Sequence, residues 1–262
     1  MNLYVYYRIS DKGRPKEKLA YADKFTCLSN AVRTFGLEYF YVLADNCSES
    51  TIDFIESLGI SYEKTALGNS ASFIYMMDII LEKHKPDDRV YLIEDDYLHL
   101  KNSKQILHEG LEIADYVSLY DHPDKYFLKK DGGNPFNYRR LQKTRIYITK
   151  SVHWRETNST TMTFACRTKT LREDRKIWKK YCGTSKTPKD FYAFITLTTR
   201  GFGEMCKLIP QFKNHKREVL ILFINFILRR KTRRLISVIP AHATHTEINW
   251  IAPGVNWDSV KS

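Results

Sequence analysis

Three consecutive carboxylates, Glu94-Asp95-Asp96, are the residues with the clearest chemical potential, and they follow the apolar run 90–93. A buried strand that ends in adjacent charges of one sign is costly unless a cation or solvent compensates them. Such oxygen ligands suit Mg²⁺ or Mn²⁺, with substrate phosphates completing the coordination shell. The alternative is a solvated acidic turn before a helix, and the triplet alone does not decide between the two.

A fourth carboxylate, Asp190, falls in the first turn of a helix that Pro188 is predicted to open. An acidic residue near a helix N-terminus is stabilising on its own, so a purely structural role is open. The functional alternative is a general base that takes the proton from an acceptor hydroxyl.

Two histidines three residues apart, His242 and His245, lie near the end of the chain. No further His or Cys follows them, and the five scattered cysteines form no CxxC pair, so zinc is not expected. Either histidine can be a hydrogen-bonded structural residue or a ligand of another metal. The odd cysteine count indicates a reducing, intracellular compartment, in which the sequons at Asn46 and Asn158 are chance matches.

Three further residues stand where predicted strands end or helices begin. Arg8 ends the first strand, and Asp45 follows the second, where an Asx-turn is the structural alternative. Ser70 lies in the small-residue turn before a helix, and a helix N-terminus favours phosphate.

Strands and helices alternate over the first hundred residues. Strands are predicted over 3–9, 40–44, 60–63 and 90–93, and helices over 19–35, from Ser50 or Thr51 to Gly59, and over 72–84. Such alternation predicts a mainly parallel sheet with helices on both faces, with ligands beyond the carboxyl ends of its strands. The second half is less regular, with strands predicted over 116–119, 145–149 and 161–166, and helices over 169–181 and 188–201.

The order of these features resembles the GT-A class of glycosyltransferases, particularly small bacterial and viral enzymes resembling family-two transferases. Glu94-Asp95-Asp96 stands where that class carries its DxD-type motif, with Glu in place of the more common first Asp. The stretch 244–247, with Trp250, Pro253 and Trp257 after it, resembles the C-terminal segment of such enzymes. The resemblance implies one α/β domain over 1–262, a Rossmann-like mixed sheet flanked by helices. Residues 1–100 would form the nucleotide-sugar-binding half and residues 101–262 the acceptor-binding half.

The resemblance also implies roles for single residues. Asp96 and His245 would hold Mn²⁺ or Mg²⁺, with His242 as the second choice of histidine. Glu94 or Asp95 would approach the ribose or the metal shell. Because Glu94 stands where Asp is more common, the resemblance does not decide which residue takes which role. The remaining implied roles are the nucleotide base for Asp45, the base or diphosphate for Arg8, the nucleotide-sugar for Ser70, and the general base of an inverting transfer for Asp190.

The charge balance indicates which classes of partner suit the protein. Lys and Arg number 42 against 30 Asp and Glu, a net charge of +12, which suits nucleic acid, an anionic membrane or phosphorylated substrates. The apolar run 219–228, followed by a basic cluster up to Arg234, fits a buried helix or one that lies on an anionic membrane. Ten residues are too few to span a bilayer. We therefore expect a cytoplasmic protein, with peripheral contact at the inner face of a membrane through 219–234.

The function that these features favour is a metal-dependent glycosyltransferase in surface glycan synthesis. It would move a sugar from a nucleoside-diphosphate sugar to a hydroxyl of a glycan, lipid-linked or other acceptor, without a nucleic-acid partner. The alternative is a nucleic-acid-binding protein or nuclease that uses the carboxylates and the basic surface. A catalytically silent member that only binds nucleotide is the third hypothesis.

Overall fold

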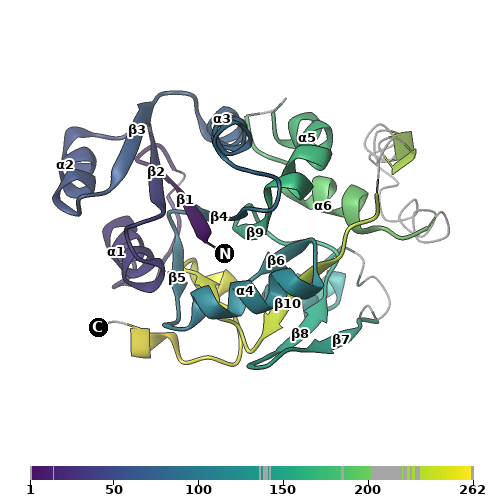
Figure 1. The fold of residues 1–262 in the computed structure, drawn as a ribbon. Coiled ribbons are helices and arrows are strands. Elements are labelled where there is room, and N and C mark those ends of the chain that lie inside the picture. Colours follow the sequence, from purple (N-terminus) through teal and green to yellow (C-terminus); the bar gives the residue numbers. More distant parts are fainter. Residues whose placement is uncertain are drawn as a thin grey trace.

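The computed structural model describes residues 2–13, 15–135, 137, 141, 143–183, 186–201, 220, 223–224, 226–227 and 231–260. Within these ranges, nine strands form one mixed sheet in the order β3-β2-β1-β4-β9-β6-β10-β8-β7, with helices on both faces (Figure 1). The expected fold class, α/β with a mixed sheet flanked by helices, is therefore confirmed.

The strands of this sheet are β1 Leu3–Ser10, β2 Phe40–Asp45, β3 Ser61–Thr65, β4 Arg89–Glu94, β6 Tyr116–Ser118, β7 Ile146–Ile148, β8 His153–Glu156, β9 Phe164–Arg167 and β10 Leu235–Ile239. A separate pair consists of β5 Tyr97–His99 and β11 Ala243–His245. The helices are α1 Lys24–Phe35, α2 Glu49–Ser57, α3 Asn69–Lys83, α4 Ser103–Ile113, α5 Thr168–Cys182 and α6 Asp190–Thr198.

Strand direction decides where side chains can meet. β3, β2, β1 and β4 are mutually parallel, so their carboxyl ends share one edge of the sheet. β9 runs antiparallel between β4 and β6, and β10 pairs in parallel with β6. The parallel half agrees with the strand–helix alternation of the first hundred residues, and the antiparallel strands come from the less regular second half.

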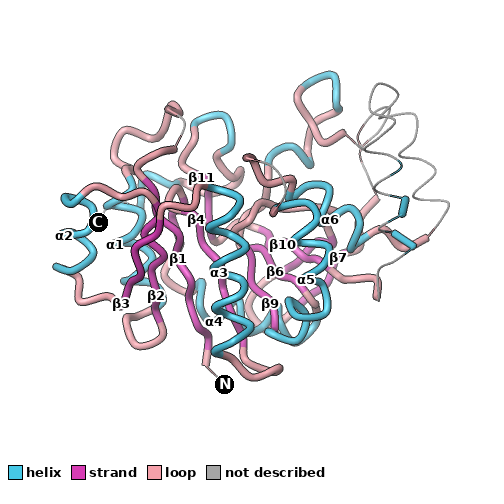
Figure 2. Tube along the Cα trace, turned by 90° about the horizontal axis from the view of Figure 1, so that it is seen from above, coloured by secondary structure: helices cyan, strands magenta, loops and turns pink. Residues whose placement is uncertain are grey.

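The two faces of the sheet bury separate apolar cores. Tyr7 and Ile9 of β1 lie in the core that also contains residues of α1, α2 and α4, whereas Tyr6 lies in the core beneath α3, α5 and α6. Because side chains alternate along a strand, Arg8 points to the same face as Tyr6. This places its guanidinium at the N-terminal end of α3, which packs over the sheet and runs roughly along the strands (Figure 2).

Several boundaries differ from those expected. α1 begins at Lys24 instead of residue 19, because the Asp23 side chain accepts a hydrogen bond from Thr26 N at 2.7 Å and starts the helix there. α2 starts earlier than expected, directly after Ser48, so Ser50 and Thr51 lie inside it. The expected strand 161–166 begins only at Phe164, and α6 ends at Thr198.

The expected membrane-contacting stretch 219–234 falls largely outside the described residues, which include only 220, 223–224, 226–227 and 231–234 of it. Among the described residues, no helix is long and apolar enough to cross a membrane. The four described cysteines, Cys27, Cys47, Cys166 and Cys182, are free thiols.

Candidate active site

The three carboxylates of the acidic triplet lie where β4 ends, and each has a different partner. Glu94 closes β4, and its Oε1 accepts a hydrogen bond from Arg8 Nη2 at 3.1 Å. Asp95 Oδ2 accepts from the backbone N of Ser10 at 2.8 Å, which joins the ends of β1 and β4. The triplet is therefore part of the sheet edge and is not a freely solvated turn.

Arg8 ties the first strand to the helix that follows β3. It is 7% exposed, and its Nη1 donates to Ser72 Oγ at 3.2 Å and to the side chain and backbone of Asn69. Its charge thus lies between a carboxylate on β4 and the first turn of α3.

Asp96 belongs to a cluster that the C-terminal segment completes. The antiparallel pairing of β5 with β11 sets Tyr97 opposite His245, and Thr246 N donates to the Asp96 backbone O at 2.8 Å. As a result, His245 Nε2 lies 3.2 Å from Asp96 Oδ2. Lys16 Nζ lies 3.0 Å from the same oxygen and 3.5 Å from Glu247 Oε2.

The pKa values of the three neighbouring acids differ because their electrostatic surroundings differ. Burial raises the pKa of Glu94 to about 7 and that of Asp95 to about 6. Burial also acts on Asp96, but His245, Lys16 and Lys18 outweigh it and hold the pKa of Asp96 well below its ordinary value. Asp96 is therefore the most acidic member of the triplet.

Asp190 is the first residue of α6, so it lies in the first helical turn, as predicted from the position of Pro188. Burial raises the pKa of Asp190 to about 6, against the opposing effects of backbone N–H groups and of the Lys125 charge. Glu94 also feels the charge of Asp190, after the larger effects of burial, Arg8 and Asp96, so the two carboxyl groups lie close enough to interact electrostatically.

A second polar group at this edge was not expected from the sequence. Lys125 follows β6, and its Nζ donates to Ser159 Oγ at 2.7 Å and to Asn158 Oδ1 at 3.1 Å. Burial lowers the pKa of Lys125 to about 8, although Asp124 favours its charge. The signal that could have found it is the polar run from Asp121 directly after the apolar strand 116–119, the same pattern that revealed Glu94.

Asp45, at the end of β2, and Ser70, in the first turn of α3, both lie near the loop between β3 and α3. Asp45 is buried, and its carboxylate accepts hydrogen bonds from Leu67 N at 2.6 Å, Gly68 N at 2.9 Å and Thr65 Oγ1 at 2.9 Å. Asp45 therefore holds the loop that starts α3. Ser70, in the first turn of α3, is 6% exposed, and its buried Oγ has no hydrogen-bond partner among the described residues.

The residues at Asp96 offer the donor types that a divalent cation needs, but they are not arranged as a ready-made metal centre. Across the described part of the chain, no three His, Cys, Asp or Glu side chains are grouped to hold a metal. Asp96, His245 and Glu247 instead surround the Lys16 ammonium, a cation that stands in at the centre of the group. Of the two histidines, His245 contacts Asp96, whereas the backbone of His242 pairs with Leu119 and Leu100.

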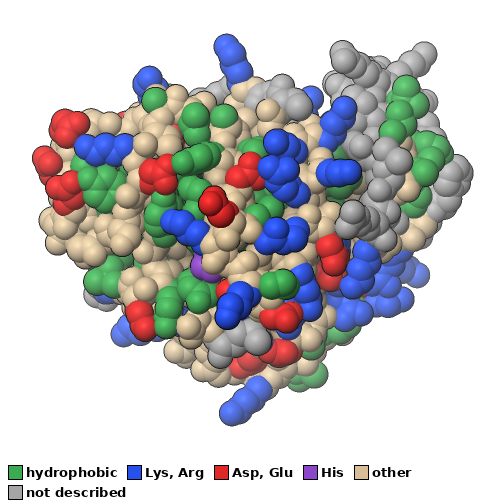
Figure 3. All heavy atoms as spheres, turned by 45° about the horizontal axis from the view of Figure 1, so that its top comes forward, with side chains coloured by type: hydrophobic (Ala, Val, Ile, Leu, Met, Phe, Trp, Pro, Cys, Tyr) green, Lys and Arg blue, Asp and Glu red, His purple; other side chains and the backbone are tan. Residues whose placement is uncertain are grey.

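The surface also shows a mixture of charges. Figure 3 shows acidic side chains, basic side chains and a histidine close together near the centre of one face.

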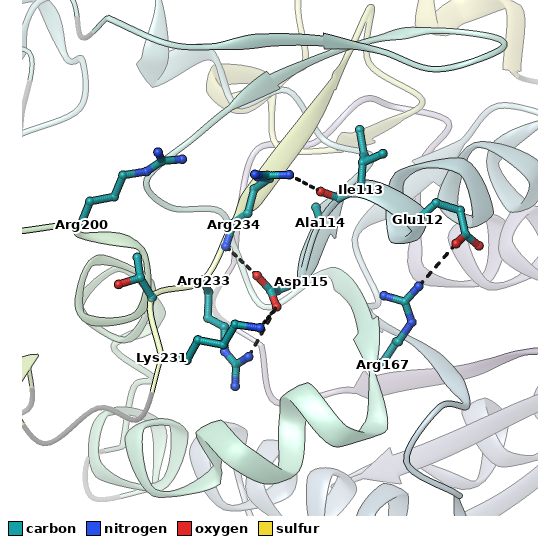
Figure 4. Close-up of a pocket in the computed structure, with 10 residues that line it drawn as sticks. Glu112, Ile113, Ala114, Asp115, Arg167, Arg200, Lys231, Arg233 and Arg234 are labelled. Atoms are coloured by element: carbon teal, nitrogen blue, oxygen red, sulfur yellow. Dashed lines mark hydrogen bonds and ion pairs between the residues drawn. The ribbon is translucent and has the colours of Figure 1, made fainter.

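A separate hollow of about 530 Å³ lies at the opposite edge, where β6 and β10 begin (Figure 4). Its lining is rich in cations, which include Arg167, Arg200, Lys231, Arg233 and Arg234. These charges are used within the protein: Arg233 pairs with Asp174 at 2.8 Å, and Arg234 Nη1 donates to the Ile113 backbone O at 2.7 Å. The hollow is thus a structural junction far from the acidic triplet.

No family model matches the chain, and no curated protein matches it. Solved structures are similar at low identity. TarS 1-349 from S. aureus is 11% identical, with 87% of this chain and 71% of that chain covered and a TM-score of 0.45. CMP:2-keto-3-deoxy-manno-octonic acid synthetase complexed with CTP is 7% identical, with 90% and 89% covered and a TM-score of 0.43.

Glucosyl-3-phosphoglycerate synthase from Mycobacterium tuberculosis, in complex with Mn²⁺, UDP and glucosyl-3-phosphoglycerate, is also similar. It is 11% identical, with 81% of this chain and 66% of that chain covered and a TM-score of 0.40. Likenesses at this level carry no argument about the activity of the chain, which must come from its own residues.

Proposed function

We propose that the chain is a glycosyltransferase that moves a sugar from a nucleoside-diphosphate sugar to a hydroxyl acceptor with inversion. The observation that carries this proposal is the Arg8–Glu94 pair at the carboxyl ends of β1 and β4, with the charge of Asp190 acting on the same Glu94 carboxyl group. A cation, a pair of carboxyl groups and the first turns of two helices meet there. In open α/β sheets this edge is where ligands bind.

The donor would lie along α3. Its first turn suits the phosphates, because the Ser70 Oγ has no partner within the described residues and the Arg8 guanidinium lies at Asn69 and Ser72. The nucleotide base would lie at the 65–68 loop that Asp45 holds, and Glu94 or Asp95 would approach the ribose.

Asp96 and His245, with Glu247 beside them, would hold Mn²⁺ or Mg²⁺. When bound, such an ion supplies positive charge that stabilises the departing diphosphate. The low pKa of Asp96 supports this role, because the carboxylate stays ionised over the whole neutral range.

Asp190 would take the proton from the acceptor hydroxyl as that oxygen attacks the anomeric carbon. A pKa of about 6 suits a general base near neutral pH, since the group is ionised there yet basic enough to accept a proton. A single in-line attack assisted by one base inverts the anomeric centre. The acceptor would be a glycan, a lipid-linked sugar or another hydroxyl compound in surface glycan synthesis. A cytoplasmic location, with peripheral membrane contact through 219–234, belongs to the same proposal.

The test is the thermal stability of the purified chain with UDP, GDP, TDP, CDP and ADP, each with and without Mn²⁺. One diphosphate is expected to stabilise the chain in a Mn²⁺-dependent manner, by about 2.7 kcal/mol at a hundredfold excess over its Kd. Asp96→Asn is expected to abolish the Mn²⁺ dependence. The matched control is Asp87→Asn, because Asp87 is an exposed carboxylate paired with Lys169 on the surface.

No stabilisation by any diphosphate at millimolar concentration would refute the proposal. Binding of DNA or RNA that weakens steeply with salt would then favour the nucleic-acid alternative, given the net charge of +12. Mn²⁺-dependent binding without transfer to any acceptor in a broad panel would favour the silent member.

A further inference from the structure

The backbone fixes Lys16 beside the acidic triplet. Leu19 N donates to the Thr246 backbone O at 2.9 Å, and Ile248 N donates to the Glu17 backbone O at 3.0 Å. The segment 17–19 is thus joined to 246–248 by hydrogen bonds on both sides of Lys18. Lys16 directly precedes this paired segment, which holds the start of its side chain next to the cluster.

The ammonium of Lys16 lies where three potential ligand side chains meet. Its Nζ is 3.0 Å from Asp96 Oδ2, 3.5 Å from Glu247 Oε2 and 3.5 Å from His245 Nε2. The Asp96 side chain is only 10% exposed, so its negative charge is compensated mainly by this ammonium and by His245. The charge of Asp96 is therefore already balanced by residues of the protein itself.

The hydrogen bonds of the His245 imidazole also favour the salt bridge over a metal ion. Its Nδ1 accepts a hydrogen bond from Glu247 N at 3.1 Å, and in a neutral ring this places the proton on Nε2. Nε2 then donates toward Asp96 Oδ2 at 3.2 Å. A metal would need the lone pair of Nε2, so the ring must exchange its tautomer before it can ligate.

We propose that the Lys16 ammonium occupies the cation position of this site, and that a divalent cation binds only as this ammonium leaves it. The inference rests on the proposed function for its biological meaning. A divalent ion lies about 2.0–2.2 Å from a carboxylate oxygen, so the ammonium cannot stay at its present distance from that oxygen without strong repulsion. The long, flexible stem of lysine allows the departure without movement of the pinned backbone.

This arrangement has two consequences for binding. The protein alone binds a divalent cation weakly, because the metal must compete with a tethered positive charge. A nucleoside diphosphate adds anionic oxygens beside the site and gives the displaced ammonium a new partner, so metal and diphosphate bind cooperatively.

The experiment is a titration with Mn²⁺ alone, in which electron paramagnetic resonance measures the free ion. Wild type, Lys16→Met and Lys18→Met are compared, each checked for an unchanged melting temperature. Lys18 is the matched control, because it is a neighbouring lysine whose charge also acts on Asp96. Lys16→Met is expected to bind Mn²⁺ about tenfold tighter or more than wild type, and Lys18→Met within about threefold of it, because only Lys16 shares the oxygen that the ion needs.

Equal Mn²⁺ affinity of Lys16→Met and wild type would overturn the inference, and so would an equal gain in Lys18→Met, which would indicate only a change in net charge. An absence of Mn²⁺ binding in Lys16→Met would overturn it as well. Failure of the proposed function looks different, because Lys16→Met would then gain Mn²⁺ affinity while no nucleoside diphosphate stabilised any variant.

Discussion

The Arg8 Nη2 lies 3.1 Å from the Glu94 Oε1, and the two residues face each other in the register of β1 and β4. One ion pair therefore joins the carboxyl ends of the two central parallel strands. Because Arg8 also donates to Ser72 on α3, the same guanidinium connects the sheet edge to the helix above it.

Arg8→Met is expected to destabilise the fold, because it leaves Glu94 and the first turn of α3 without their partner. The side chains of Arg8 and Glu94 are 8% and 25% exposed, so we expect a loss of about 2–3 kcal/mol in the free energy of unfolding by urea. Arg8→Met/Glu94→Gln should recover part of that loss, since no uncompensated carboxylate remains. A double variant no more stable than Arg8→Met would show that the pair is not coupled.

Asp190→Asn is expected to lower transfer by about 10²–10⁴-fold, the usual contribution of a general base, while the chain stays folded.

The pKa of Asp190 is raised from 3.8 to about 6, so the native state holds this proton more tightly than the unfolded state. The contribution to stability is then full below about pH 4 and is lost as pH rises through about 6. Asp190→Asn should therefore be at least as stable as wild type at about pH 7.5, and a clear loss of stability there would contradict this account.

The pH dependence of transfer tests the same carboxyl group together with Lys125. Transfer should rise with pH through about 6 as Asp190 ionises. Because the Lys125 charge favours the ionised carboxylate, Lys125→Met should shift this limb to higher pH. Lys129→Met, on the adjacent exposed turn, is the control that should leave the limb in place. If the pH dependence of transfer is the same in Lys125→Met as in wild type, the Lys125 charge does not act on Asp190.

The sequence predicts the parallel half of the fold well and misses several elements of the other half. α4 was not predicted, although its buried residues Ile106, Leu107 and Leu111 lie on one helical face. A Cβ at Gly110 would come within 2.8 Å of Trp154 and of Val117, so the glycine serves close packing against β8 and β6. β5 and β11 have three residues each, too short for a periodic signal, and only their mutual pairing defines them.

Local sequence patterns predicted the candidate site where its residues end predicted strands or begin predicted helices, whereas His245 was predicted from the resemblance of the C-terminal stretch. Glu94, Asp96 and Asp190 satisfy that condition, and the charge of Asp190 acts on Glu94. Lys16 and Glu247 do not satisfy it, since they meet through hydrogen bonds between segments near opposite ends of the chain. Long-range backbone pairing of this kind leaves no local pattern in the sequence.

Asp45→Ala is expected to destabilise the loop before α3. Leu67 N and Gly68 N both donate to this buried carboxylate, and Ala would leave two backbone donors without their acceptor. A fully buried donor without its acceptor costs about 1–3 kcal/mol, and these two donors are only partly buried, so the free energy of unfolding should fall by about 2–4 kcal/mol, below the full sum. Asp53→Ala, at an exposed position of α2, is the control and should change stability by less than about 0.5 kcal/mol.

Asp45→Asn separates the loop from the charge. The amide keeps one acceptor oxygen for Leu67 N but turns an NH₂ group toward the Gly68 N, so it should lose roughly half as much stability as Asp45→Ala. If the loop also positions the nucleotide base, the stabilisation by the preferred diphosphate should fall in the same order, from wild type to Asn to Ala. Equal nucleotide binding in all three chains, with the expected loss of stability, would leave Asp45 as a structural residue and move the base to another part of the site.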